Sequence, residues 1–450
     1  MEKLNPREIA VNIISEINEE GAYSNISLKE NFSNYSHLTD LDKAFITTIV
    51  NGTIRYLLTI DYVINQFSKT KTKKMKAVIR SILRSSVYQI LFMDKVPASA
   101  ACNEAVKITK RRGLSGLAGF VNGVLRNISR NKDNIIYPDP HKDFINYLSI
   151  KHSFPKWIIE YWLDHYSKEF VEELCHASNI NPKVSIRCNL LKSDVDSLTD
   201  SLLKENIDVS KGLYLKEALY ISKTSSISEL DSFKKGLFQV QDESSMLVGH
   251  IVNPKVGEKI LDVCSAPGGK STHLAELMNN KGYILARDIH ENKLNLVKSS
   301  AKRLGIDIIE SQVKDASAID EKMLNKMDKV LVDAPCSGLG IIRKKPDIKW
   351  KKENSDLKEL IGIQRRILEV SSKYVNKDGV LVYSTCTISE KENLENIEWF
   401  IKNFDFVLED IDPYIPKKLQ NENSKQGYIK LYPHIHNTDG FFIARLRRKN

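Results

Sequence analysis

From about residue 255 onward, apolar runs alternate with helical stretches, and this pattern constrains the fold more than any other feature. Five strand-like runs begin at residues 259, 282, 306, 328 and 379: KILDVC, GYILARD, IDIIESQVKD, DKVLVDAP and GVLVYSTC. Helical patterns at 268–278, 291–305 and 357–375 separate them, and FVLEDI and GFFIARL supply late strands. Such alternation predicts a parallel sheet with helices on both faces.

The rest of the chain has a different period. Apolar residues recur at helical spacing in residues 1–135, as in Ile9, Ile13 and Ile17, which predicts an all-α bundle of five to seven helices. Asn5 and Pro6 are a suitable cap and first turn. The polar stretch 131–143 predicts a linker. Helical and strand-like patterns mix from 150 to 245. We therefore expect a multidomain protein: 1–135 all-α, 150–245 small α+β, and 246–450 α/β.

The positive charge is concentrated in the N-terminal part. The 450 residues carry a net charge of +10, and residues 1–130 hold 19 Lys and Arg against 11 Asp and Glu. A polyanionic partner is expected, and the clusters at 69–84 and 107–113 favour RNA phosphate contacts. A merely solvated basic face is the alternative. The candidate RNA-binding residues are Lys73, Lys76, Arg80, Arg84, Lys110, Arg111 and Arg112.

Other features exclude several classes of protein. The six cysteines form no Cys-x-x-Cys pair, so no metal site is expected, and their scatter indicates reduced thiols in the cytoplasm. The acidic, amphipathic N-terminus does not have the pattern of a signal peptide. No apolar run is long enough to span a bilayer, so no membrane partner is expected. We expect a monomer.

The loop CSAPGGK at 264–270 joins the first strand of the alternating region to a helix. It matches neither Gly-x-x-x-x-Gly-Lys-Ser/Thr nor Gly-x-Gly-x-x-Gly, which leaves a tight turn where backbone approaches a ligand. Asp288 lies 20 residues after Gly268 at the end of the second strand, as expected for a ribose-binding acid. Asp315 ends the third strand at the same edge, although such a residue is often only a helix cap. The pattern predicts that this loop binds an adenosine-bearing cofactor. The alternative is a turn that binds no ligand.

Two thiols follow later strands. Asp333 and Cys336 lie at the end of one strand and Cys386 at the end of another, so parallel neighbours would bring them to one crevice. Buried cysteine packing is the alternative. A thiolate that adds to C6 of a pyrimidine makes C5 nucleophilic, and an acid near N3 stabilises the adduct. C5 then takes a methyl group from a sulfonium donor, and a base removes the C5 proton. The residues fit this chemistry.

On these motifs the C-terminal half resembles the RNA (cytosine-5) methyltransferases of the Nol1/Nop2/Sun type. The resemblance rests on CSAPGGK, DAPCSG at 333–338, RKKPDIKW at 343–350, STCT at 384–387 and DGFFIARL at 439–446. It implies a Rossmann-like domain that binds S-adenosylmethionine, with Cys386 as nucleophile, Cys336 assisting product release and Asp333 contacting the target base. The cofactor-binding residues that it implies are Cys264, Ser265, Ala266, Pro267, Gly268, Gly269, Lys270, Asp288, Asp315 and Asp333.

The N-terminal region resembles the NusB-type antitermination-factor fold, whose members bind RNA. NPREIAVNII, LTDLDKAFITTIVNGTIRY and AACNEAVKITKRRGLSGLAGFVNGVLRNI carry this resemblance. Together the three regions resemble the bacterial 16S rRNA cytosine-5 methyltransferases of the Sun/Fmu type, although Ser265 stands where many relatives have Ala. The resemblance implies methylation of a cytosine in 16S rRNA or a small-subunit assembly intermediate. A tRNA cytosine-5 methyltransferase and a non-catalytic RNA-binding assembly factor are the alternatives, and a DNA enzyme would leave the Thr-Cys motif unexplained.

Overall fold

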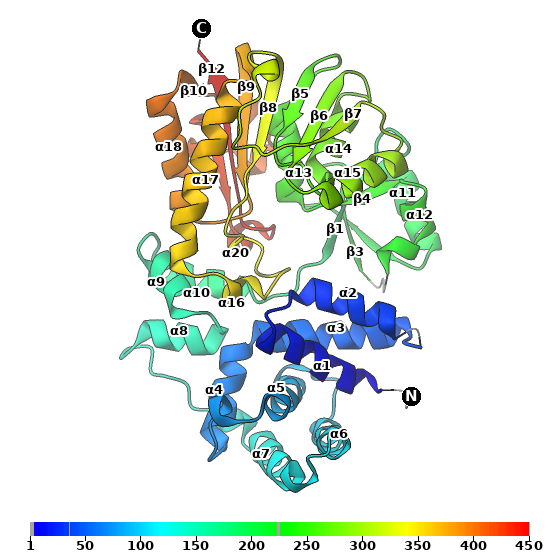
Figure 1. Cartoon of the computed structure of the whole chain (residues 1–450), viewed down its shortest axis with the longest axis vertical. Helices are drawn as coiled ribbons and strands as arrows, with labels where there is room; N and C mark the ends of the chain where they lie inside the picture. The colour runs from blue at the N-terminus through cyan, green and yellow to red at the C-terminus, as the bar shows by residue number, and fades with distance from the viewer. Residues whose placement is uncertain (1–3, 36, 223–225, 450) are drawn as a thin grey trace. The chain divides into compact units, whose positions relative to one another are not determined.

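The chain forms two compact units in the computed structural model, which describes residues 4–35, 37–222 and 226–449 (Figure 1). The first unit comprises residues up to 179 together with 344–351, and the second comprises 180–343 and 352–450. Residues 150–179 therefore group with the N-terminal helices, and 180–245 group with the C-terminal sheet. The domain boundaries expected from the sequence stay predictions.

Seven helices at the start of the first unit confirm the predicted bundle. They are α1 (Pro6–Glu19), α2 (Ser24–Asn34), α3 (Asp40–Arg55), α4 (Leu57–Phe67), α5 (Ala77–Phe92), α6 (Ala98–Arg111) and α7 (Ala118–Arg130). Asn5 caps α1 as expected, because its side-chain oxygen accepts a hydrogen bond from the Glu8 amide at 2.9 Å. Ile9, Ile13 and Ile17 are buried in the bundle core.

The first unit is completed by α8 (Phe144–His152), α9 (Lys156–Leu163), α10 (Lys168–Ala177) and the short α16 (Ile348–Lys351). Lys349 is fully buried, and its ammonium group donates to the Arg55 carbonyl at 2.8 Å and to Asn179 Oδ1 at 3.2 Å. Trp350 Nε1 donates to the Ile54 carbonyl at 2.8 Å. Most of the RKKPDIKW motif thus packs with the helical unit, although its sequence position lies between strands of the large sheet.

The second unit begins with a small antiparallel sheet in the order β2-β3-β1-β4. Its strands are β1 (Val184–Cys188), β2 (Asp208–Lys211), β3 (Ala218–Ser222) and β4 (Phe238–Val240). Leu198 and Leu202 of α11 (Val195–Lys204) pack on this sheet, and α12 (Asp231–Lys234) precedes β4. The α+β character expected for this region is confirmed.

The large sheet has the order β10-β12-β9-β8-β5-β6-β7, with β11 paired to β12. Its parallel part consists of β5 (Lys259–Asp262), β6 (Tyr283–Asp288), β7 (Ile309–Val313), β8 (Met327–Asp333) and β9 (Val375–Thr385). The late strands are β10 (Phe406–Leu408), β11 (Tyr428–Leu431) and β12 (Phe441–Arg448). β12 runs antiparallel to β9, so the sheet is mixed, and β11 was not expected from the sequence.

Helices cover both faces of the large sheet, as the alternation predicted (Figure 1). One layer contains α13 (Glu243–Val252), α14 (Gly269–Leu277) and α15 (Glu291–Leu304), and the other contains α17 (Asn354–Ser372) and α18 (Leu394–Asn403). Successive strand residues point to opposite layers: Ile260 packs in the first and Leu261 in the second. The carboxyl ends of β5 to β9 therefore form one edge, where such sheets bind ligands.

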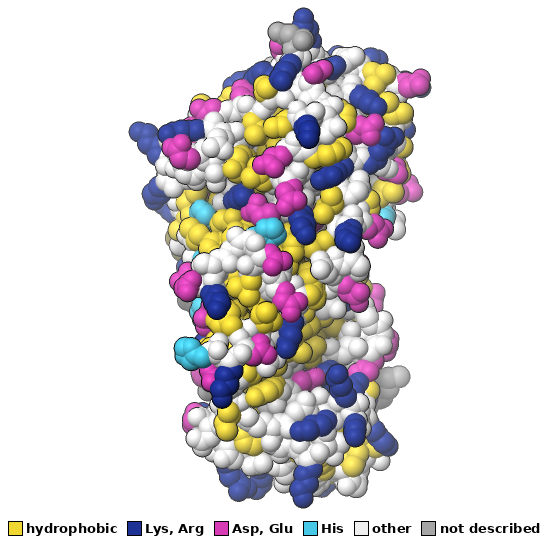
Figure 2. Space-filling model, turned by 90° about the vertical axis from the view of Figure 1, so that its left-hand side faces the viewer, with side chains coloured by type: hydrophobic (Ala, Val, Ile, Leu, Met, Phe, Trp, Pro, Cys, Tyr) yellow, Lys and Arg dark blue, Asp and Glu magenta, His cyan; other side chains and the backbone are white. Residues whose placement is uncertain are grey.

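Three further features bear on what the sequence predicted: the cysteines, the length and polarity of the helices, and the surface charge. All six cysteines are free thiols. Among the helices of the described residues, none combines the length and the apolar character needed to cross a bilayer. On the face drawn in Figure 2, Lys and Arg side chains gather at the lower end, over the first unit.

Candidate active site

The CSAPGGK loop connects β5 to α14 at the carboxyl edge of the large sheet. Two backbone hydrogen bonds close the turn: the Ser265 amide donates to the Arg287 carbonyl at 2.8 Å, and the Gly268 amide donates to the Ser265 carbonyl at 2.7 Å. Gly268 has a φ of +100°, and a Cβ at this position would lie 3.0 Å from Val297 Cα. Glycine is therefore required both by the backbone conformation and by the close approach of α15.

Carboxylates converge on this loop from neighbouring strands. Asp288 ends β6, Asp315 follows β7 and Asp333 ends β8. Burial raises the pKa of the Cys264 thiol well above its usual value, and the negative charges of Asp262 and these three aspartates raise it further. The edge is therefore acidic around a protonated thiol, an environment that favours a cationic ligand such as a sulfonium.

The residues at the loop fit S-adenosylmethionine. Among the described residues, no side chain makes a hydrogen bond to Asp262 Oδ1 or Ser265 Oγ, which are both buried, so both atoms can bind a ligand. Asp315 is exposed, and its Oδ1 accepts from the Ser317 amide at 2.8 Å and from Ser317 Oγ at 2.7 Å. Asp315 therefore caps a turn, which is the alternative that the sequence left open. Its role with the cofactor stays a prediction.

The two thiols are brought together by the pairing of β8 with β9. These strands are parallel, with Asp333 opposite Ser384, and the Sγ atoms of Cys336 and Cys386 lie 3.4 Å apart. The hydrogen bond to Cys386 and burial raise the pKa of Cys336 well above its usual value. Cys336 therefore remains a thiol, in direct contact with the Cys386 sulfur.

Lys270 and Asp333 form an ion pair beside the thiols. Lys270 Nζ donates to Asp333 Oδ2 at 2.6 Å, and Ser384 Oγ donates to Asp333 Oδ1 at 2.7 Å. Burial lowers the pKa of Lys270, but the charges of Asp333 and Cys386 outweigh it, so the pKa is raised overall. Lys270 is thus an ammonium group that orients a carboxylate.

Glu392, which the sequence analysis missed, holds the DAPCSG loop in place. The Ser337 amide donates to its Oε1 at 2.8 Å and Ser337 Oγ donates to its Oε2 at 2.6 Å, while Gln364 Nε2 donates to Oε1 at 3.0 Å. Glu392 is fully buried. It lies in the polar stretch SEKEN, which looks like a surface segment, so the sequence carried no signal of this role.

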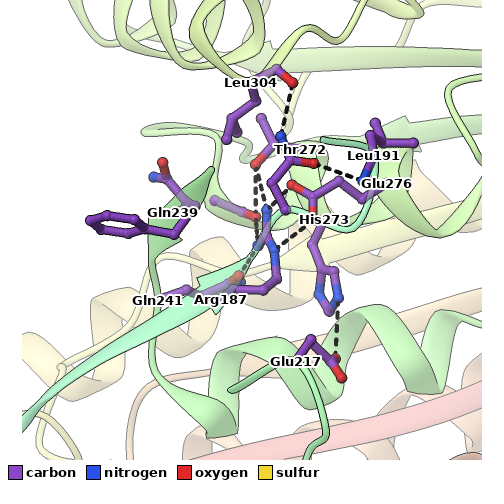
Figure 3. Close-up of polar contacts among 12 residues, drawn as sticks. Arg187, Leu191, Glu217, Gln239, Gln241, Thr272, His273, Glu276 and Leu304 are labelled. Atoms are coloured by element: carbon purple, nitrogen blue, oxygen red, sulfur yellow. Dashed lines mark hydrogen bonds and ion pairs between the residues drawn. The ribbon is translucent and has the colours of Figure 1, made fainter. Parts of the chain in front are cut away.

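Arg187, which was also missed, supports the cofactor loop from behind (Figure 3). This fully buried residue of β1 donates to both carboxylate oxygens of Glu276 on α14, at 2.8 and 3.0 Å. It also donates to the Gly269 carbonyl at 3.0 Å and contacts Gln241. A charged residue inside the otherwise apolar run VSIRC was the available signal.

Arg84 does not lie on an exposed basic face, and this corrects the sequence interpretation of α5. Its guanidinium group makes two hydrogen bonds to Asp61 on α4, at 2.6 and 2.8 Å, and the residue is buried. A helix has about 3.6 residues per turn, so i, i+4 and i+8 positions drift around its axis, here towards α4. Arg80 forms an ion pair with Glu19 at 2.5 Å. Both arginines line a hollow of about 580 Å³ in the first unit.

The remaining RNA-binding candidates stay predictions. Lys73, Lys76 and Lys110 are exposed. Arg111 and Arg112 each lie 3.2 Å from a carboxylate oxygen of Glu8. These ion pairs neutralise part of the positive charge that was predicted to contact RNA phosphates.

Three family models match consecutive parts of the chain. Residues 4–130 match the NusB family, 154–228 match a ferredoxin-like domain of RsmF/B-like methyltransferases, and 249–447 match the 16S rRNA methyltransferase RsmB/F. The second match specifies the fold of the small α+β region as ferredoxin-like.

Relatives and solved structures match over most or all of the chain. The probable ribosomal RNA small subunit methyltransferase B of Bacillus subtilis is 39% identical and covers 100% of both chains. The corresponding Synechocystis protein is 34% identical over 99% of this chain and 100% of its own. The crystal structure of PH0851 matches with a TM-score of 0.82 at 29% identity, over 99% of each chain. NSun6 from Pyrococcus horikoshii with SFG matches with a TM-score of 0.59 at 26% identity, over 66% of this chain and 99% of its own.

Replacing Arg187 by Lys is expected to weaken cofactor binding. Lysine keeps the charge, but it cannot make two parallel hydrogen bonds to Glu276 and also bind the Gly269 carbonyl. The N-terminal end of α14 is therefore held less firmly. We expect the Kd for S-adenosylmethionine to rise about tenfold, or about 1.4 kcal/mol. Isothermal titration calorimetry on the full chain measures this change.

Arg303→Lys is the matched control. Arg303 of α15 donates to the carbonyls of Phe233 and Phe238, each at 2.9 Å, so it also joins the small sheet region to the large one. Among the described residues, its hydrogen bonds go to the small sheet region and not to the loop at 264–270, and lysine keeps the charge that Arg303 presents to Glu276. Arg303→Lys should lower the free energy of unfolding and leave the Kd unchanged. Equal changes in Kd for both variants would contradict a specific role of Arg187.

Asp262 is expected to make stability depend on pH. Burial raises its pKa from 3.8 to about 7, although Ser271 Oγ donates to its Oδ2 at 2.6 Å. The folded state binds this proton more tightly than the unfolded state, so stability is lost as pH rises from about 4 to 7. The Asp262→Asn variant lacks this titration. Its free energy of unfolding, relative to that of the wild type, should therefore rise by about 2.5 kcal/mol between pH 5 and pH 8. Urea unfolding without cofactor at the two pH values checks this; a pH-independent difference would refute it.

Proposed function

The chain belongs to the RsmB/F family of 16S rRNA methyltransferases, and from this premise we propose that it methylates C5 of a cytosine in small-subunit ribosomal RNA. It is an S-adenosylmethionine-dependent rRNA methyltransferase, and the finer assignment concerns the atom that is modified. The observation that carries the proposal is the pair of thiols 3.4 Å apart at the ends of β8 and β9, beside Asp333. Methylation at a nitrogen or oxygen would not need two adjacent thiols.

Cys386 is the nucleophile in this proposal. Cys336 holds its proton beside the Cys386 sulfur, and the Lys270 ammonium group favours negative charge nearby. The Cys386 thiolate attacks C6 of the cytosine, the S–C6 bond forms, and the ring electrons make C5 nucleophilic. S-adenosylmethionine supplies the methyl group as an electrophile. A base then removes the C5 proton, the C5–C6 double bond reforms, and the S–C6 electron pair returns to Cys386.

Asp333 faces the same place from the end of β8. Lys270 and Ser384 occupy one carboxylate oxygen each, which fixes the plane of the group. A carboxylate held in this way contacts the polar edge of the target base and orients C6 towards Cys386. The cytosine must be unpaired or flipped to enter such a site.

The two cysteine variants are expected to fail at different steps. Cys386→Ala should lose methylation, because no covalent adduct forms. Cys336→Ala should form the adduct but release product slowly, so that RNA-bound protein accumulates. Turnover with labelled cofactor and denaturing gel analysis of RNA-linked protein measure both effects.

Cys102→Ala is the control for the loss of a thiol, since Cys102 is buried in the helical bundle of the first unit. It should retain turnover and form no stable adduct. Full methylation by Cys386→Ala would overturn the assignment of the nucleophile.

The substrate class is tested by transfer to purified RNAs. Deproteinised 16S rRNA should accept label at C5 of one cytosine, and tRNA should accept none; nuclease digestion and mass spectrometry identify the modified base. Transfer to tRNA alone would establish the tRNA enzyme instead. Cofactor binding without transfer to any RNA, including assembly intermediates, would favour the non-catalytic assembly factor.

A further inference from the structure

One cluster of metal-ligating side chains lies outside the catalytic crevice. Glu217 immediately precedes β3, His250 is on α13 and His273 is on α14, and one ligand atom from each lies within 4.8 Å of the other two. No metal site was expected from the sequence, because it contains no closely spaced cysteines. These three residues are far apart in the sequence and meet only through the fold.

His273 is the first sign that the cluster lacks a partner. The residue is only 2% exposed, and its Nε2 atom, which faces the cluster, lies 3.7 Å from Glu217 Oε1, beyond hydrogen-bond range. Nδ1 lies towards Gly249 and has no hydrogen-bond partner among the described residues. Figure 3 shows the ring directed at Glu217. Buried polar groups are nearly always satisfied, so this imidazole is unusual.

The surroundings of His273 prepare it as a ligand. A Cβ at Gly249 would lie 2.6 Å from Nδ1, so glycine at this position of α13 leaves the space that the ring occupies. The ring is thus held beside α13 with Nε2 facing Glu217.

Glu217 and His250 complete the set. His250 Nε2 lies 2.5 Å from Glu217 Oε1. The Glu217 side chain is 9% exposed and that of His250 is 28% exposed. An ion can therefore enter past His250, which also leaves a position open for water.

We propose that Glu217, His250 and His273 bind one divalent transition-metal ion, with Zn²⁺ as the best match. Two imidazole nitrogens and one carboxylate oxygen suit Zn²⁺, whereas Mg²⁺ and Ca²⁺ prefer oxygen ligands. Ligand bonds of about 2.0–2.2 Å need only small side-chain movements from the present separations. Binding inserts the ion between His250 and Glu217, in place of the direct contact between them.

The ion would connect elements rather than take part in methyl transfer. Glu217 comes from the small sheet, while His250 and His273 come from two helices that cover the large sheet. His273 lies on the same helix as Lys270, about one turn further along, so the ion would help to hold α14 in place behind the loop at 264–270. This inference is independent of the atom that the enzyme methylates.

The test is metal binding by the full chain. Chelator-treated, tag-free protein is titrated with ZnCl₂ in a calorimeter, and with CoCl₂ in a spectrophotometer. We expect one ion per chain and a higher melting temperature with Zn²⁺. His250→Ala and Glu217→Gln should each weaken binding at least about tenfold, because each removes one of three ligands. His141→Ala, which removes an exposed histidine in the first unit, should bind normally.

Cobalt separates this site from the catalytic thiols. Ligation by nitrogen and oxygen gives visible d–d bands without the ultraviolet thiolate-to-cobalt charge-transfer band that Cys336 or Cys386 would produce. The wild-type spectrum tests the proposal even where a variant fails to fold. No saturable binding by the wild type, a thiolate band, or unchanged affinity in both variants would overturn the proposal.

Discussion

The parallel pairing of β8 with β9 is the constraint on which the catalytic crevice depends. Because Asp333 lies opposite Ser384, the loops that follow deliver Cys336 and Cys386 to the same point. A slip of one residue would turn every side chain of a strand to the other face of the sheet. The Gly340 amide donates to the Cys386 carbonyl at 3.0 Å, and the Gly440 amide donates to the Gly340 carbonyl at 2.8 Å. A Cβ at Gly340 would lie 2.0 Å from the Gly440 carbonyl oxygen. Glycine at position 340 therefore allows the loops that carry Cys336 and Cys386 to be hydrogen-bonded to the residue that precedes β12.

Buried charges then couple the small sheet to the helices behind this crevice. The carboxylate of Glu243 on α13 accepts hydrogen bonds from three successive amides, those of residues 213–215, and from the Tyr220 hydroxyl. Arg187 plays the corresponding part for α14 through Glu276. Buried ion pairs add little net stability, because desolvation offsets the attraction. Breaking one leaves a buried charge unpaired, however, so such groups define one relative placement of sheet and helix.

Prediction from the sequence worked where function depends on local order along the chain. Asp288 and Asp333 could be placed because parallel strands present their carboxyl ends at one edge, and motif spacing located the cofactor loop. The roles of Arg187 and Glu392 could not be predicted in this way, because their partners are distant in the sequence. Arg84 was misplaced because Asp61 on another helix binds it. Lys349 of the RKKPDIKW motif is buried in the helical unit, and no local sequence pattern indicates this packing. The spacing of apolar residues indicates which face of a helix or strand is buried, but it does not indicate which element packs against that face.

The two thiols have different tasks in the proposed reaction because Cys386 affects the proton affinity of Cys336. In the resting site, the hydrogen bond and charge of Cys386 are major causes of the raised pKa of Cys336, which therefore holds its proton. Once Cys386 is bonded to C6, its sulfur is a thioether and a weak acceptor, so these two causes disappear. Cys336 can then lose its proton to solvent water, and the resulting thiolate accepts the C5 proton. One 3.4 Å contact can thus keep Cys336 protonated during attack and make it available as a base during release.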